Sequence, residues 1–143
     1  MKFSVILPAF NRAHLIRAAL QSVLDQTRQA DEIIVIDDGS TDDIIGALSP
    51  YISQIILLRQ PNAGVAAARN LGVTRAIGDW LTFQDSDDLW TPGHLAAVER
   101  ALSNATPDVI VHLGDVLYTG SGYAKSLFEI KGLHFPEARA VLA

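Results

Sequence analysis

The sequence has no cysteine, no long apolar run and no excess of positive charge, and each absence excludes a class of function. Without cysteine the chain forms no disulfide, uses no thiolate nucleophile and builds no zinc–sulfur site. No stretch approaches the ~20 apolar residues of a membrane-spanning helix. The apolar start at residues 3–7 is too short for a secretory signal. The formal net charge of −5 argues against a general nucleic-acid-binding surface.

The composition is that of a globular protein. The chain has 143 residues, of which 49% are hydrophobic and 19% charged, enough for one domain with a buried core. The lack of cysteine is compatible with a reducing cytoplasm, so we expect a cytoplasmic protein, with peripheral attachment to the inner face of a membrane left open. Half of the 16 acidic residues fall in two groups, which are Asp37, Asp38, Asp42, Asp43 and Asp79, Asp85, Asp87, Asp88.

Apolar strand patterns alternate with helical patterns along the chain. We expect strands at residues 3–7, 32–36, 54–58, 79–83 and 109–113, with helices between them and a loop at 119–126. We expect Asn11, Ser40 or Thr41, and Thr91 to cap the helices that follow them. This order predicts an α/β fold, a Rossmann-like three-layer sandwich with a mostly parallel sheet.

Three polar segments follow the predicted strands, at 8–11, 37–40 and 85–88. The carboxyl ends of parallel strands lie at one edge of a sheet, and α/β proteins bind ligands beyond that edge. The sequence therefore predicts one binding site built from all three segments.

The segment 85–88 has three carboxylates in four residues. Like charges this close repel and raise one another's pKa, and a divalent cation removes that cost. Asp85 and Asp87 are two residues apart, so on an extended backbone both would face the same side. We favour a metal and phosphate site here, since Mg²⁺-type ions use one or two carboxylates together with substrate phosphates. The alternative is a solvated turn in which Asp88 or Thr91 caps the next helix.

The other candidates each have a structural alternative. Asp37 or Asp38 could accept hydrogen bonds from a nucleobase or ribose, or the segment could be a tight turn closed by Ser40. Phe10 could stack on a base or pack in the core. Arg69 could bind a phosphate or pair with a surface acid.

Together these segments closely resemble the family 2 inverting glycosyltransferases of the GT-A fold. The resemblance extends from Phe3 to about Tyr118. It rests on the ordered pieces Ser4–Arg12, Val35–Asp42, Asn62–Gly64 with Ala68–Asn70, and Asp85–Asp88 with Pro92.

The resemblance implies a nucleoside-diphosphate sugar as donor, most often a uridine diphosphate sugar, and Mn²⁺ or Mg²⁺. By position, Pro8 and Phe10 would flank the base, Asp38 in preference to Asp37 would bind it, Asp85 would contact the ribose or sugar side, and Asp87 would hold the metal. The implied donor-binding residues are Pro8, Ala9, Phe10, Asn11, Asp37, Asp38, Asn62, Gly64, Arg69, Asp85 and Ser86, and the implied metal ligands are Asp87 and Asp85.

The resemblance also implies a general base in a later, acceptor-binding half, and no such base is identified here. The late acids Asp115, Glu129 and Glu137 have no convincing motif around them. We therefore expect residues 1–118 to be the donor-binding portion and 119–143 a loop and the start of a truncated acceptor-side region. The resemblance implies an acceptor that is a sugar, a lipid-linked molecule or a protein, in a process such as cell-envelope polysaccharide synthesis. The sequence does not distinguish among these acceptors.

Two other functions are compatible with parts of the pattern. A non-catalytic nucleotide-sugar-binding module would share every donor-side residue. A receiver-type signalling domain needs a lysine at a late strand end, and the chain has lysines only at positions 2, 125 and 131. If an acceptor-side half is missing, the apolar surface it would cover could drive self-association.

Overall fold

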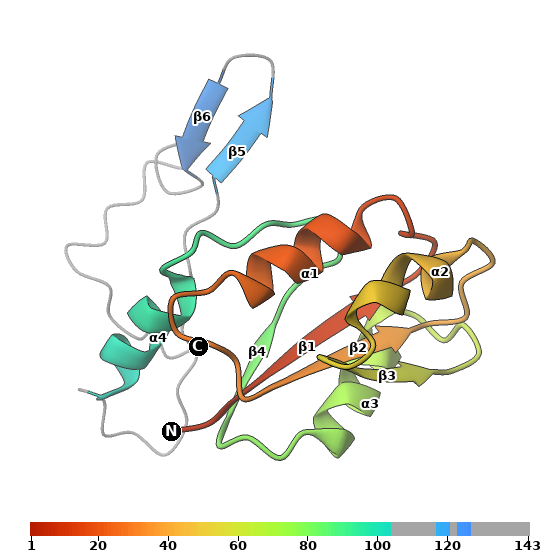
Figure 1. Cartoon of the computed structure of the whole chain (residues 1–143), viewed down its shortest axis with the longest axis horizontal. Coiled ribbons are helices and arrows are strands. Elements are labelled where there is room, and N and C mark those ends of the chain that lie inside the picture. Colours follow the sequence, from red (N-terminus) through yellow and green to blue (C-terminus); the bar gives the residue numbers. More distant parts are fainter. Residues whose placement is uncertain (104–116, 121–122, 127–143) are drawn as a thin grey trace. The chain divides into compact units, whose positions relative to one another are not determined.

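The computed structural model describes residues 1–103, 117–120 and 123–126. Its main element is a four-stranded parallel sheet with the strand order β3-β2-β1-β4 (Figure 1). The strands are β1 (Phe3–Ala9), β2 (Glu32–Asp37), β3 (Ile56–Arg59) and β4 (Trp80–Phe83). The strands before and after each crossover are therefore parallel, as the alternating sequence pattern predicts.

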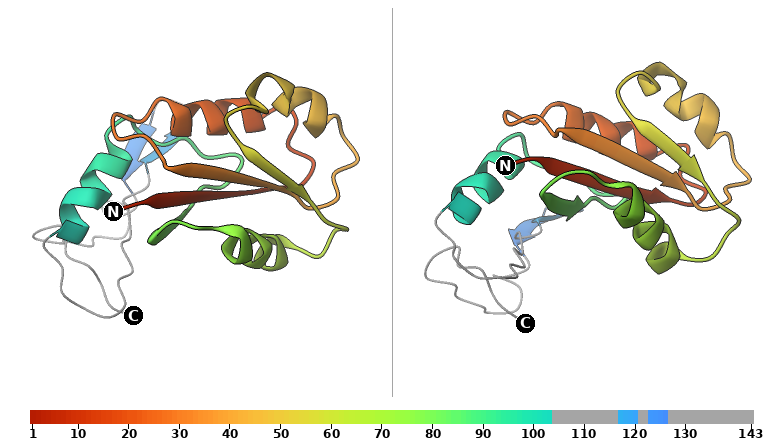
Figure 2. Two further views of the ribbon diagram at one scale, coloured as in Figure 1. Left: turned by 60° about the horizontal axis from the view of Figure 1, so that its bottom comes forward. Right: turned by 90° about the horizontal axis from the view of Figure 1, so that it is seen from below.

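Helices cover both faces of this sheet. The helices α1 (Ile16–Leu24) and α2 (Ile44–Leu48), the latter followed by a short 3₁₀ helix at Ser49–Tyr51, lie on one face, and α3 (Val65–Arg75) lies on the other (Figure 2). The expected Rossmann-like three-layer sandwich is confirmed. A further helix, α4 (His94–Ser103), follows β4. None of the described helices has the length and hydrophobicity to cross a membrane.

The core between α3 and the sheet is tightly packed. Ile6, Ile34, Ile36 and Ala68 form a fully buried cluster. A Cβ atom added to Gly72 would lie 2.5 Å from Ile6 Cγ2 and 2.9 Å from Ile36 Cδ1, closer than real contacts allow. The small residues of α3 therefore let the helix approach the sheet, which holds the start of α3 beside the strand ends.

Three predicted helix caps are wrong. The helix α1 begins only at Ile16, after a turn, and no side chain caps it. The cap of α2 is Asp43, whose carboxylate accepts the Gly46 N–H at 3.0 Å. The helix α4 begins at His94, whose N–H donates to the backbone carbonyl of Thr91 at 3.0 Å. For α1 and α2 the loop extends further than the capping-type residue indicates, because Asn11 bonds to Ser40 and Thr41 across neighbouring loops instead.

The predicted loop at 119–126 is also wrong. Strands β5 (Leu117–Gly120) and β6 (Tyr123–Ser126) form an antiparallel pair, with Gly120 opposite Tyr123. The β-forming residues on either side of the Gly-Ser-Gly turn signal outweigh its loop-like composition. The strand predicted at 109–113 and the tail after 126 lie outside the described residues.

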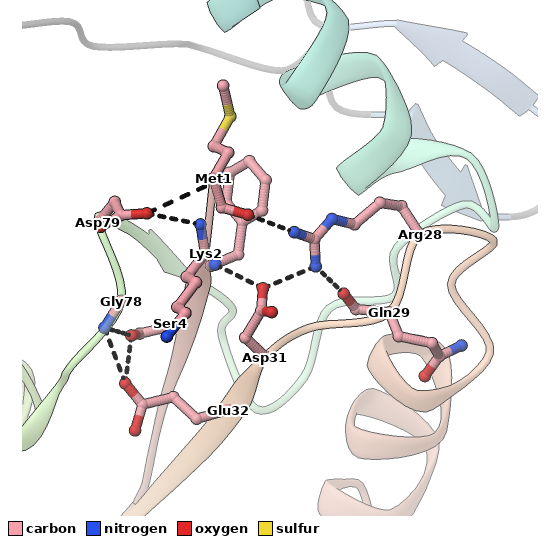
Figure 3. A network of polar contacts seen from close by, with 10 residues as sticks. Met1, Lys2, Ser4, Arg28, Gln29, Asp31, Glu32, Gly78 and Asp79 are labelled. Atoms are coloured by element: carbon pink, nitrogen blue, oxygen red, sulfur yellow. Dashed lines mark hydrogen bonds and ion pairs between the residues drawn. The ribbon is translucent and has the colours of Figure 1, made fainter.

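A polar network at the amino-terminal edge of the sheet ties the entry of β4 to β1 and β2 (Figure 3). The Gly78 N–H donates to Ser4 Oγ at 2.9 Å and to Glu32 Oε1 at 3.2 Å, and the Ser4 hydroxyl donates to the same carboxylate. The Lys2 N–H donates to Asp79 Oδ2 at 2.8 Å. A side chain at Gly78 would collide with Ser4. The network therefore fixes the register of β4 against β1.

Candidate functional site

A pocket of about 540 Å³ lies at the carboxyl edge of the sheet. This volume is within the range of small-molecule sites. The first, second and fourth strand-end loops and the start of α3 all contribute to its wall. The lining residues are Pro8, Ala9, Phe10, Arg12, Asp38, Asn62, Gly64, Val65, Ala68, Arg69, Asp85, Ser86 and Asp87.

The loop after β1 is locked against the loop after β2 by Asn11. Asn11 has a positive φ of 52°, a conformation that asparagine tolerates. Its N–H donates to Ser40 Oγ at 2.9 Å, and its Oδ1 accepts the Thr41 N–H at 2.8 Å. Asn11 does not line the pocket; its neighbours Phe10 and Arg12 do. The structure thus makes Asn11 the residue that holds this loop in place.

The adjacent acids Asp37 and Asp38 have different surroundings. Asp37 is fully buried, accepts the Ser40 N–H at 2.8 Å and pairs with Arg59 at 3.1 Å. It does not line the pocket, whereas Asp38 does. Gly39, which follows Asp38 and precedes Ser40, has a φ of +76°, as a tight turn requires. Asp37 therefore closes the turn that presents Asp38.

Asp38 organises the loop that leads into α3. Its Oδ1 accepts from Gln60 Nε2 at 2.6 Å and from the Ala63 N–H at 3.0 Å, and its Oδ2 accepts from the Gly64 N–H at 2.8 Å. Burial raises the pKa of Asp38, but these three hydrogen bonds outweigh it and hold that pKa below its ordinary value. The group is therefore a buried carboxylate anion at one wall of the pocket.

The acidic segment after β4 is a tight turn. The Asp88 N–H donates to the Asp85 carbonyl at 3.1 Å, so the expectation of an extended backbone that directs Asp85 and Asp87 to the same side is wrong. Both acids still line the pocket, each beside a different arginine. Asp85 pairs with Arg69 at 2.6 Å, and Asp87 pairs with Arg12 at 3.7 Å.

The charges of the turn act on Asp88 as the sequence predicts. Partial burial, followed by the negative charges of Asp85 and Asp87, raises the pKa of Asp88. Within the residues that the structure describes, no three His, Asp or Glu side chains gather into a ligand set for a metal. A cation at this turn would thus need oxygen ligands from another molecule as well, as Mg²⁺-type ions accept from phosphates.

Two buried glutamines support the acidic turn. Gln84 Nε2 donates to the Asp88 carbonyl at 2.6 Å. Gln26, which is 1% exposed, donates to the Thr91 carbonyl at 2.7 Å and accepts the Leu95 N–H at 2.9 Å. Gln26 thereby holds the segment after the turn against α1. Sequence reasoning missed both glutamines, because nothing in their spacing distinguishes them from surface residues.

The structure gathers most of the predicted site residues. Asn62, Gly64, Arg69 and Ser86 line the pocket with the others, and only Asn11 and Asp37 of the predicted set do not. Arg12, Val65 and Ala68 were not predicted. The one available signal for Arg12 was its position beside Asn11 in the first polar segment.

A Rossmann-like sheet with a polar pocket at its carboxyl edge is the arrangement in which α/β proteins bind ligands. The chain belongs to the family Glycosyl transferase family 2, which matches residues 4–135. The resemblance to family 2 glycosyltransferases of the GT-A fold is thereby confirmed.

Relatives and solved structures agree with this assignment. An uncharacterized glycosyltransferase of Rickettsia conorii is 48% identical over 91 residues, which cover 62% of this chain and 15% of that protein. S. aureus TarS 1–349 in complex with UDP has a TM-score of 0.67 and 28% identity, covering 72% of this chain and 32% of that one. The mannosyltransferase PcManGT from Pyrobaculum calidifontis, in complex with GDP-Man and Mn²⁺, has a TM-score of 0.67 and 29% identity, covering 76% and 34%. The chain thus spans about a third or less of the length of these proteins.

Proposed function

We propose that this chain forms the donor site of a metal-assisted inverting glycosyltransferase that uses a nucleoside-diphosphate sugar, with uridine diphosphate as the nucleotide. The observation that carries the proposal is the convergence of an exposed aromatic ring, a buried carboxylate, two arginines and an acidic turn on one pocket. Among the structures similar to this one, TarS is in complex with UDP and PcManGT with GDP-Man, which supports a nucleoside-diphosphate ligand.

The pocket offers separate surfaces for the base and for the diphosphate. Phe10 is 42% exposed at the pocket wall, and a base can stack on its ring. Asp38 is the acceptor for base N–H groups, because its Oδ2 takes only one hydrogen bond among the described residues and a carboxylate oxygen accepts two. A ligand without those donors would leave the acceptor unpaired, which gives selectivity.

The diphosphate is assigned to the side formed by α3 and the acidic turn. No side chain caps the start of α3, so its first N–H groups face outward with the positive end of the helix dipole. Arg69 lines the pocket beside this helix and brings a further positive charge. These groups offset part of the negative charge of a diphosphate on a chain whose net charge is −5.

The acidic turn fits a divalent cation. The carboxylate of Asp87 is half exposed and pairs with an arginine 3.7 Å away, so it is available as a ligand. Asp85 is held by Arg69 at 2.6 Å, which suits it to the ribose or sugar side or to a secondary place in the metal sphere. A bound Mn²⁺ or Mg²⁺ would act as a Lewis acid that stabilises the departing nucleoside diphosphate.

We also propose that residues 1–118 serve donor binding and that 119–143 begin an acceptor-side region. The late acids considered as bases, at 115, 129 and 137, lie outside the described residues. Transfer by this chain alone is therefore a separate question from donor binding. A transfer assay measures UDP release from a UDP-sugar with and without an added acceptor. Release that depends on the acceptor would identify an enzyme, and no release would identify a binding module.

Isothermal titration calorimetry with UDP, with and without Mn²⁺, tests the donor site. We expect Mn²⁺ to tighten UDP binding about tenfold or more, and Asp87→Asn to remove most of that gain. Asp25→Asn is the matched control, since Asp25 follows α1 and does not line the pocket. Equal UDP affinity in wild type and Asp87→Asn, with and without Mn²⁺, would contradict the metal assignment.

A further inference from the structure

Two arginine–carboxylate pairs line the pocket, and they differ in how firmly they are held. Arg69 contacts Asp85 at 2.6 Å, and its guanidinium also lies 5.7 Å above the ring of Phe83. Arg12 contacts Asp87 at 3.7 Å, with the two side chains 41% and 50% exposed. The first pair is fixed by a second contact, whereas the second pair is loose and solvated.

The backbone beneath Arg12 is fixed although its side chain is not. The preceding residue is locked to the loop after β2, and the Ala13 N–H donates to Asp42 Oδ2 at 2.8 Å. Apart from Asp87, the guanidinium has one long hydrogen bond within the described residues, from Nη1 to the Asn11 carbonyl at 3.4 Å. Arg12 is therefore a cation anchored at the pocket wall whose head group can change partner.

We propose that Arg12 is an exchangeable counter-cation of the donor site. It pairs with Asp87 while no divalent cation is bound, and it turns to the anionic diphosphate when a cation takes that carboxylate. This inference rests on the proposed function, because it assumes that Asp87 is a metal ligand and that a diphosphate enters the pocket.

The exchange makes the metal and the diphosphate help each other bind. A diphosphate that attracts Arg12 exposes Asp87 to the metal, and a metal on Asp87 releases Arg12 to the diphosphate. Coupling of this kind is reciprocal, so each ligand tightens the other by the same factor. An exposed ion pair contributes at most a factor of about five to such an equilibrium, which sets the expected size.

Calorimetric titrations of the full chain with Mn²⁺ alone, with UDP alone and with both test the inference. Arg12→Gln should bind Mn²⁺ alone about two- to fivefold more tightly than wild type, because Asp87 has lost its competing cation. The same variant should bind UDP alone about three- to tenfold more weakly. The factor by which Mn²⁺ tightens UDP binding should shrink about two- to fivefold, the size set by the ion pair. Arg12→Lys, which keeps the charge, should retain most of that factor.

The matched control is Arg75→Gln. It removes one positive charge from the last turn of α3, at the end of the helix away from the pocket-lining residues. Arg12→Gln and Arg75→Gln should differ in Mn²⁺ affinity and in coupling, since only Arg12 contacts Asp87. Thermal unfolding of each variant confirms that it is folded at the titration temperature.

The outcomes separate the inference from the proposed function. If Arg12→Gln and Arg75→Gln have the same Mn²⁺ affinity and the same coupling, the exchange is refuted even when Asp87→Asn still abolishes the Mn²⁺ effect. If Asp87→Asn keeps the full Mn²⁺ effect on UDP binding, the metal assignment itself fails. Mn²⁺ binding that is measurable only in Arg12→Gln would support the exchange, and absence of any Mn²⁺ effect on UDP binding in every variant would overturn both.

Discussion

Replacing Asp38 by asparagine should weaken both the fold and donor binding. The carboxylate accepts three hydrogen bonds, from Gln60, Ala63 and Gly64. An asparagine offers one oxygen and one NH₂ group, so at least one of the three donors then faces another donor. Losing a hydrogen bond to a buried charged group costs about 1.5–3 kcal/mol, which urea unfolding should report. We expect UDP affinity to fall about tenfold in addition.

Asp37→Asn is the control next to it in sequence. Asp37 is as buried as Asp38, but it bonds to Ser40 and Arg59 and does not line the pocket. Its replacement should cost a similar ~1–3 kcal/mol of unfolding free energy while largely preserving UDP affinity in the folded protein. If Asp37→Asn lowers UDP affinity as much as Asp38→Asn does, the assignment of base recognition to Asp38 is wrong.

The depressed pKa of Asp38 adds a pH signature to this pair of variants. A carboxyl group whose pKa is lower in the folded state stabilises the fold above its unfolded pKa of about 3.9, and that stability is lost as the pH falls through the folded value. The stability gap between wild type and Asp38→Asn should therefore be full near pH 7 and narrow below about pH 4. Urea unfolding across this range measures it, and a gap that widens on acidification would refute the sign.

Three further substitutions test the packing and the acidic turn. Gly72→Ala should destabilise by about 1–3 kcal/mol in urea unfolding, because its Cβ would overlap Ile6; an unchanged midpoint would mean that α3 sits further from the sheet. Gln26→Ala should cost about 2–4 kcal/mol and weaken Mn²⁺-dependent UDP binding, because it leaves the Leu95 N–H without its partner and removes one of the two donors to the Thr91 carbonyl. Asp88→Asn should raise stability at pH 7 by up to about 0.5 kcal/mol by relieving repulsion, an effect that thermal unfolding at pH 3 should no longer show.

The sequence alone was sufficient to predict where the site lies, for a simple geometric reason. Parallel strands place their carboxyl ends at one edge, so polar segments after 3–7, 32–36 and 79–83 meet whatever their detailed conformation. The same reasoning does not give side-chain direction. Asp85 and Asp87 stay at the pocket although the extended backbone expected for them is a turn.

The missed features depend on contacts between segments far apart in sequence. Asn11 is compatible with a helix cap, and only its bonds to residues 40 and 41 reveal it as a lock between loops. Arg12 points into the pocket as a consequence of that lock, so its role was not accessible from residue type. Gln26, two residues after the end of α1, reaches across to residues 91 and 95, a contact that periodicity cannot show.

The network around Gly78, at the amino-terminal edge of the sheet, determines where the acidic turn lies at the opposite edge. It sets Trp80 opposite Phe3, and from there each residue of β4 advances the chain by about 3.3 Å toward the pocket. The number of residues between Gly78 and the acids therefore sets the position of the turn. Deleting one residue between Gly78 and the acids would move the turn by about 3.3 Å. It would also reverse which side chains of β4 face each helical layer. The position of the acids thus depends on contacts at the opposite end of β4, whose four residues span roughly 13 Å.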